Sequence, residues 1–249
     1  MPAADSSSRV EMIEYLAFGE RRPARVELPP GEPRSMAIIL SGVVMFGLDA
    51  ERPATRGLLE FGDQLAELLL SSGRGVVRPE PFRADRDADG CIAAAASLDE
   101  AVVEAWPDVP GVRIGLSAAV PLMAVASGDL PSALFVLISP PILETYGNRP
   151  ERLDLPLAEA LGILPAVAAE IGARAPMHAG ASVASRALVV HGSADRIVPP
   201  ADAIGWRASL AAGGVDAARL EVAFAGHDLE PCRPSVLDAI GRHLDEVGA

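Results

Sequence analysis

Short apolar segments alternate with helical patterns along most of the chain, and this alternation strongly limits the folds available to it. Candidate strands lie at 36–40, 75–78, 113–116, 133–138, 187–191 and 219–224. Candidate helices lie at 56–72, 91–106, 118–127, 200–212 and 235–247. Residues 10–18 and 24–28 precede them as an antiparallel pair. Strands and helices in this order predict an α/β protein whose mostly parallel sheet is flanked by helices.

One segment, 141–185, interrupts the alternation, because it is longer than a simple crossover connection between two strands. It contains one long helical pattern at 157–171 between turns rich in Pro and Gly. We interpret it as a small lid insertion in a core formed by 10–140 and 186–249, with residues 1–9 as a disordered tail. The alternative is a longer crossover helix with an irregular loop.

The charge balance limits the partners of the chain. The 249 residues carry a formal net charge of −13, which repels phosphate backbones, so we expect no nucleic-acid partner. No apolar run approaches the roughly 20 residues of a membrane helix, and the N-terminus shows no secretory pattern, so we expect a cytoplasmic protein without a membrane partner. The sequence does not indicate an oligomeric state.

The chain contains no lysine, and all 21 basic residues are Arg. Schiff-base chemistry, pyridoxal-phosphate anchoring and a P-loop lysine are therefore excluded. Cys91 and Cys232 form no CxxC pair, and the four His residues are dispersed without the spacing of metal ligands. We expect no metal and no cofactor.

The stretch from Arg113 to Pro121 suggests a nucleophile. A short apolar run ends at Ser117, where a helical pattern begins. A serine at such a strand-to-helix turn lies on a tight bend with an exposed hydroxyl, and the small residues Gly115 and Ala119 let the two backbone arms pass closely. The alternative is that Ser117 only caps the helix.

Two further polar residues follow candidate strands. Asp195 comes after the strand at 187–191, and His227 comes after the strand at 219–224. Because the carboxyl ends of parallel strands meet at one edge of the sheet, both side chains are expected near Ser117. Taken singly, Asp195 is equally compatible with a turn cap before Ile197, and His227 with a surface loop.

Three local patterns carry a resemblance to the α/β-hydrolase superfamily: GLSAA at 115–119, HGSADRIVPP at 191–200 and AGHDL at 225–229. The resemblance extends from about residue 10 to the final helix, and the chain order Ser, Asp, His is that of the superfamily. It implies that Ser117 is the nucleophile, His227 the general base and then acid, and Asp195 the group that orients the imidazole.

The resemblance also implies an oxyanion site formed by the backbone N–H groups of Val43 and Ala118. Two positions depart from the usual pattern, since Ser41 replaces the common His before Gly42, and Ala119 replaces the usual Gly. Substrate contacts are expected from Val44, Tyr146 and Met177. Several apolar residues of the proposed lid are expected either to cover an acyl pocket or to belong to the core: Leu157, Leu161, Ile163, Leu164 and Val167.

The function favoured by these patterns is that of a serine hydrolase, which would cleave an ester, lactone or thioester of a small apolar acyl substrate through an acyl-enzyme. An alternative keeps the fold and changes the reaction, as in a cyclase, lyase or acyltransferase of a bacterial natural-product pathway. A third possibility is a non-catalytic ligand-binding protein, against which the full Ser, Asp and His set argues.

Overall fold

The computed structural model describes residues 8–42, 53–80, 87–126, 132–143, 165–175, 184–246 and 248. Within these ranges eight strands form one sheet, in the order β1-β2-β4-β3-β5-β6-β7-β8. The strands are β1 (Arg9–Ala17), β2 (Glu20–Leu28), β3 (Met36–Ser41), β4 (Gly75–Pro79), β5 (Gly111–Leu116), β6 (Leu134–Ile138), β7 (Arg186–Gly192) and β8 (Asp216–Val222).

The sheet is parallel from β4 to β8, and its first two strands form an antiparallel ribbon that joins it at β4. The central strands β3, β5, β6 and β7 are apolar and almost entirely buried, as expected for parallel strands that are covered on both faces. The predicted α/β class and the predicted opening strand pair are both confirmed.

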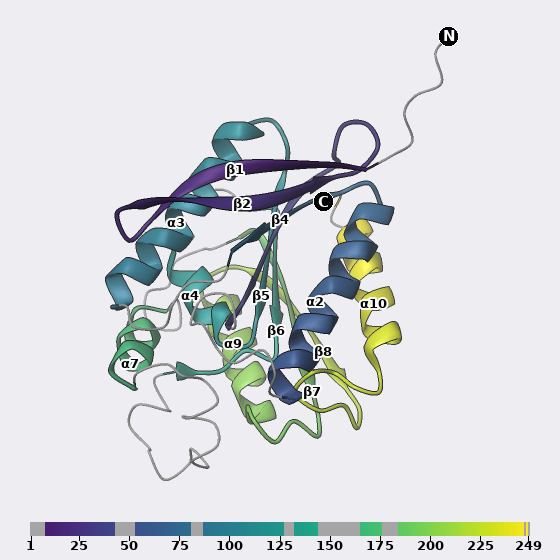
Figure 1. Ribbon diagram of the computed structural model, residues 1–249. Coiled ribbons are helices and arrows are strands. Elements are labelled where there is room, and N and C mark those ends of the chain that lie inside the picture. The colour runs from purple at the N-terminus through teal and green to yellow at the C-terminus, as the bar shows by residue number, and fades with distance from the viewer. Residues whose placement is uncertain are drawn as a thin grey trace.

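Helices cover both faces of the sheet (Figure 1). The helices α2 (Pro53–Ser71) and α10 (Arg233–Glu246) lie on one face, and the other face carries α3 (Ala88–Ala105), α4 (Ala119–Ala126), α7 (Pro165–Arg174) and α9 (Pro200–Ala212). Each face encloses its own cluster of buried apolar side chains. In α2, the apolar residues at helical spacing form the buried stripe that this spacing predicts: Leu58, Phe61, Leu65 and Leu69.

Strand β8 differs from its predicted bounds, because it runs from Asp216 to Val222 and not over 219–224. Its first residues are polar or small and form an exposed edge, so they show no apolar run. Its predicted end is wrong because Phe224 has a φ of 62°, a left-handed conformation that cannot continue a strand. Phe224 lies in the turn that leads to His227.

Helix α7 is the described helix of the segment 141–185, and it ends at Arg174, later than predicted. Val167 and Ile171 are buried in the same apolar cluster as residues of α3 and α4. Val167 therefore belongs to the core, which is the second of its two predicted roles. Residues 157–164, where the predicted helix begins, lie outside the described ranges.

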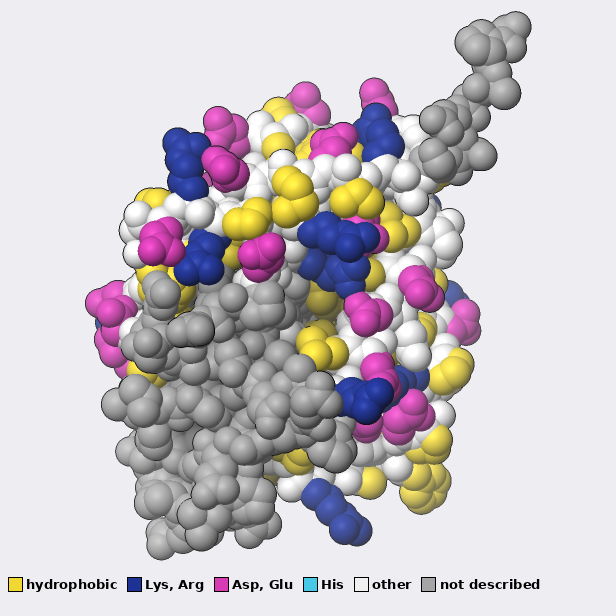
Figure 2. All heavy atoms as spheres, in the orientation of Figure 1, with side chains coloured by type: hydrophobic (Ala, Val, Ile, Leu, Met, Phe, Trp, Pro, Cys, Tyr) yellow, Lys and Arg dark blue, Asp and Glu magenta, His cyan; other side chains and the backbone are white. Residues whose placement is uncertain are grey.

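Figure 2 shows acidic and Arg side chains interspersed over the visible described surface, without a region of a single sign. Acidic residues interspersed with Arg in this way are typical of a solvated surface. Among the helices in the described ranges, none is long and apolar enough to cross a bilayer.

A buried ion pair joins α3 to the centre of the sheet. Arg113 of β5 and Asp99 of α3 are only 3% and 6% exposed, and the Nε–H of Arg113 donates to Oδ2 of Asp99 at 2.9 Å. A second hydrogen bond, from Nη2 to the same oxygen, makes the contact two-pronged. The two partners satisfy each other inside the protein, which makes their removal one at a time costly.

We expect Asp99→Leu to lower the free energy of unfolding by about 3–5 kcal/mol, because it leaves the buried Arg113 guanidinium without its carboxylate. The double variant Asp99→Leu/Arg113→Met removes both charges and is expected to recover most of that loss. Urea unfolding of the two variants and the wild type measures the difference. A double variant no more stable than the single one would contradict this account.

Candidate active site

The backbone hydrogen bonds of the parallel strands continue one residue past the sheet at three neighbouring positions. The N–H of Ser117 donates to the carbonyl of Ile138 at 2.8 Å, and that of Ser139 donates to Val190 at 2.8 Å. The N–H of Ser193 donates to the carbonyl of Val222 at 2.9 Å. The first residues after β5, β6 and β7 are therefore held at a single edge of the sheet.

Ser117 stands on a sharp turn between β5 and α4. Its φ is 53°, which is uncommon for a residue other than glycine. Gly115 makes the turn possible, because a Cβ there would lie 2.9 Å from the Cα of Val120. Ala119, on the other side of the serine, is fully buried and is accommodated as the first residue of α4. The predicted tight crossing of the two backbone arms is present.

The loops that carry Asp195 and His227 are joined to each other directly. At Gly192, a Cβ would lie 2.3 Å from the carbonyl oxygen of Ala225, so only glycine permits the close approach of the two loops. The N–H of Ala194 donates to the same carbonyl at 3.0 Å. The N–H of Phe224 donates to Oγ of Ser193 at 2.9 Å.

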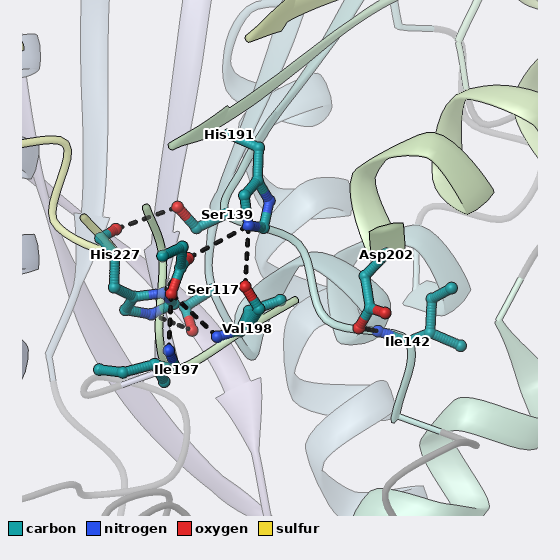
Figure 3. Close-up of polar contacts among 9 residues, drawn as sticks. Ser117, Ser139, Ile142, His191, Ile197, Val198, Asp202 and His227 are labelled. Atoms are coloured by element: carbon teal, nitrogen blue, oxygen red, sulfur yellow. Dashed lines mark hydrogen bonds and ion pairs between the residues drawn. The ribbon is translucent and has the colours of Figure 1, made fainter. Parts of the chain in front are cut away.

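The structure brings Ser117, Asp195 and His227 together, although the serine is 110 residues from the histidine in sequence. Nε2 of His227 lies 2.9 Å from Oγ of Ser117, and Nδ1 lies 2.8 Å from Oδ2 of Asp195 (Figure 3). All three residues are buried. Burial protects these hydrogen bonds from competition with water.

The protonation pattern follows from the donors and acceptors. The ionised Asp195 carboxylate can only accept, so Nδ1 of His227 carries a hydrogen and donates it to Oδ2. In the neutral ring, Nε2 is then an acceptor, and the hydroxyl of Ser117 donates to it. This tautomer lets the ring take a proton from the serine hydroxyl.

Burial acts to raise the pKa of Asp195, but hydrogen bonds from His191, His227 and the backbone of Val198 outweigh it and hold that pKa well below its usual range. Oδ1 accepts the N–H groups of Ile197 at 2.8 Å and Val198 at 2.9 Å. One oxygen of Asp195 therefore caps the turn before Ile197, as the turn-cap interpretation predicts, while the other accepts the hydrogen bond from His227.

Two further residues at this edge were not identified from the sequence. Ser139, at the end of β6, donates its Oγ hydrogen to the carbonyl of His227 at 3.0 Å. His191 is the next-to-last residue of β7, and its Nε2 lies 3.2 Å from Oδ2 of Asp195. Both stand at the carboxyl ends of strands, so the rule that identified Asp195 and His227 also applies to them.

The remaining predicted site residues have mixed outcomes. Ala118 is fully buried and lies between Ser117 and the start of α4, and its role as an oxyanion donor stays a prediction. Val43, Val44, Tyr146 and Met177 lie outside the described residues. Within the described ranges, no group of three or more His, Cys, Asp or Glu side chains is arranged to hold a metal ion.

Comparison with solved structures identifies the fold. Est1E from Butyrivibrio proteoclasticus matches 95% of this chain and 98% of its own, at a TM-score of 0.70 and 16% identity. The match with a Pyrobaculum calidifontis esterase covers 96% of this chain and 85% of that esterase, at a TM-score of 0.68 and 20% sequence identity. The chain has the α/β-hydrolase fold.

The Pyrococcus horikoshii acylaminoacyl peptidase shares this fold too, with a TM-score of 0.70 and 12% identity over 96% of this chain and 41% of its own. The α/β-hydrolase fold therefore carries more than one chemistry, and the site must decide the function. No protein-family model matches the sequence, and a search of curated proteins found no match.

The geometry at Gly115 predicts an asymmetry between the two small residues that flank Ser117. Gly115→Ala is expected to destabilise the fold by about 1–3 kcal/mol, because its Cβ meets backbone atoms of Val120 that cannot move freely. The matched change Ala119→Gly meets no obstacle and costs about 1 kcal/mol of helix stability. Denaturant unfolding compares them, and equal losses would contradict the steric argument.

The lowered pKa of Asp195 predicts a pH-dependent contribution to stability. The pKa in the unfolded chain is about 3.9, so ionised Asp195 stabilises the fold above about pH 4, and this contribution is lost as the pH falls further. The free energy of unfolding should fall more steeply between pH 5 and 3 in the wild type than in Asp195→Asn (both limits are about one pH unit from that pKa). Parallel curves would rule the contribution out.

Proposed function

We propose that this protein is a serine hydrolase that cleaves an ester, lactone or thioester of a small apolar carboxylic acid. The observation that carries the proposal is the continuous chain of hydrogen bonds from Ser117 through His227 to Asp195, with distances of 2.9 and 2.8 Å. The positive φ of Ser117 supports it, because strain of this kind is typical of nucleophile turns.

In the first half of the reaction, Oγ of Ser117 attacks the substrate carbonyl while Nε2 of His227 takes the hydroxyl proton. The imidazolium formed in this way is stabilised by the carboxylate of Asp195. The carbonyl oxygen becomes an oxyanion, for which the backbone N–H groups of Ala118 and Val43 are the proposed donors. His227 then returns the proton to the leaving alcohol or thiol, and an acyl ester remains on Ser117.

In the second half, His227 removes a proton from water, and the resulting hydroxide attacks the acyl carbon. The imidazolium gives that proton to Oγ of Ser117 as the acyl bond breaks, which releases the carboxylic acid and restores the starting state. Asp195 is suited to both halves, because its low pKa keeps it ionised while the histidine gains and loses a proton.

The apolar part of the substrate is proposed to be covered by the segment 141–185. The start of this segment is held to α9, since the N–H of Ile142 donates to Asp202 at 2.9 Å and Nε1 of Trp206 donates to the carbonyl of Pro141 at 3.0 Å. The apolar residues at 157–164 are the proposed cover, with Val44, Tyr146 and Met177 as proposed substrate contacts.

An organophosphonate probe and a series of p-nitrophenyl esters of increasing chain length test the proposal. The wild type is expected to be labelled at Ser117 and to hydrolyse the shorter esters. Ser117→Ala should abolish labelling and reduce kcat/KM by a factor of about 10³ or more, because the nucleophile is lost. Mass spectrometry locates the label, and release of p-nitrophenol measures turnover.

Ser185→Ala is the matched control, because Ser185 directly precedes β7, at the amino ends of the parallel strands, and its hydroxyl donates to the carbonyl of Ala133. It is expected to behave as the wild type. Labelling of Ser117 without turnover of any ester would exclude hydrolysis and favour a non-hydrolytic acyl transfer. Absence of labelling in a folded wild type would exclude nucleophilic chemistry at Ser117 altogether.

A further inference from the structure

A second imidazole reaches the carboxylate of Asp195 from strand β7. His191 is 1% exposed, and its Nε2 lies 3.2 Å from Oδ2 of Asp195 and 3.0 Å from the carbonyl oxygen of Val198. Figure 3 shows the ring of His191 extending from its strand toward Val198. Nothing in the proposed reaction steps uses this ring.

The neighbours of His191 determine its protonation. A backbone carbonyl can only accept, so Nε2 must carry the hydrogen that it shares between Val198 and Asp195. Nδ1 is buried, and no hydrogen-bond partner for it lies among the described residues. A hydrogen on Nδ1 would find no acceptor among those residues, which is costly. Nε2–H is therefore the donor of this ring, directed to Val198 and close to the carboxylate.

With His191 included, four N–H groups surround the two oxygens of Asp195. Oδ1 accepts the N–H groups of Ile197 and Val198, and Oδ2 accepts Nδ1–H of His227. Nε2–H of His191, which donates to the carbonyl of Val198, lies 3.2 Å from Oδ2 and adds a fourth attraction. A carboxylate held in this way cannot rotate without breaking a hydrogen bond. The plane of the carboxylate, and with it the direction in which Oδ2 faces His227, is therefore fixed.

We propose that His191 is a positioning residue that holds Asp195 ionised and correctly oriented toward His227. This inference rests on the proposed function of the Ser117 site and extends it to a residue that touches no substrate. The titratable side chains that contact this carboxylate in the described structure are His191 and His227. Burial raises the pKa of Asp195, and the surrounding donors lower it. Loss of one donor should therefore raise this pKa.

The test uses two replacements of the same side chain. His191→Gln keeps an N–H donor on a side chain of similar reach, whereas His191→Phe keeps the ring volume and removes the donor. If His191→Phe does not fold, His191→Asn replaces it, because its shorter amide does not reach the position of Nε2. Leu188→Ala, a core change on the same strand, controls for a general loss of stability.

The first measurement is the rate constant for phosphonate labelling of Ser117 as a function of pH. His191→Phe is expected to lower it by about tenfold or more at neutral pH, as for the loss of a hydrogen bond to a charged group. It should also change the acidic part of the profile, because Asp195 then takes up a proton more readily. His191→Gln should stay within about threefold of the wild type and keep its profile.

A purely structural role for His191 predicts a different result. His191→Phe and Leu188→Ala would then lose stability and labelling rate together, with an unchanged pH profile and no recovery in His191→Gln. That pattern would overturn the proposal. An unchanged rate in His191→Phe would overturn it as well.

A second measurement separates this proposal from the proposed function. Carbon NMR of the Asp195 carboxyl group follows its ionisation without any reaction at Ser117. The resonance is expected to titrate at higher pH in His191→Phe than in the wild type, and to return toward the wild-type behaviour in His191→Gln. If the wild type is never labelled, the hydrolase proposal fails while this titration still decides the role of His191. Identical titration in all three proteins would overturn it.

Discussion

The parallel alignment of β5, β6, β7 and β8 is the constraint on which the candidate site depends. Because these strands run in the same direction and are paired in register, their carboxyl ends meet at one edge. The pairing continues past the strands, through backbone hydrogen bonds from Ser117, Ser139 and Ser193. Residues far apart in sequence are thus positioned by the sheet, before any of their side chains interact.

The loops that follow the strands determine the ionisation of Asp195. The close approach at Gly192 brings the loop of Asp195 against the loop of His227. A buried carboxylate would ordinarily favour its protonated form, but the donors gathered around Asp195 reverse this tendency. The low pKa of the acid therefore depends on His191 of β7 and on two loops in contact, and the ionised carboxylate sets the tautomer of His227.

Apolar periodicity predicted most of the fold because the buried stripes of α2 and of the central strands are formed by local sequence. It failed where tertiary context overrides local pattern. The polar start of β8 is a strand only because it pairs with β7, and Phe224 ends it by adopting a positive φ. Ser139 was missed because its hydrogen-bond partner, the carbonyl of His227, lies on another segment of the chain, and His191 was missed because its approach to Asp195, four residues later, depends on the turn between them.

The sequence by itself determined the α/β class, the turn at Ser117 and the chain order of the three polar residues, because these depend on local periodicity and on short patterns. Only the tertiary structure decided that Asp195 caps its own turn and also accepts a hydrogen bond from His227. The two oxygens of this carboxylate accept from donors on different segments of the chain. The tertiary structure also decided that His191 shares the same carboxylate. Hydrogen bonds between distant segments have directions and distances that no spacing along a chain encodes.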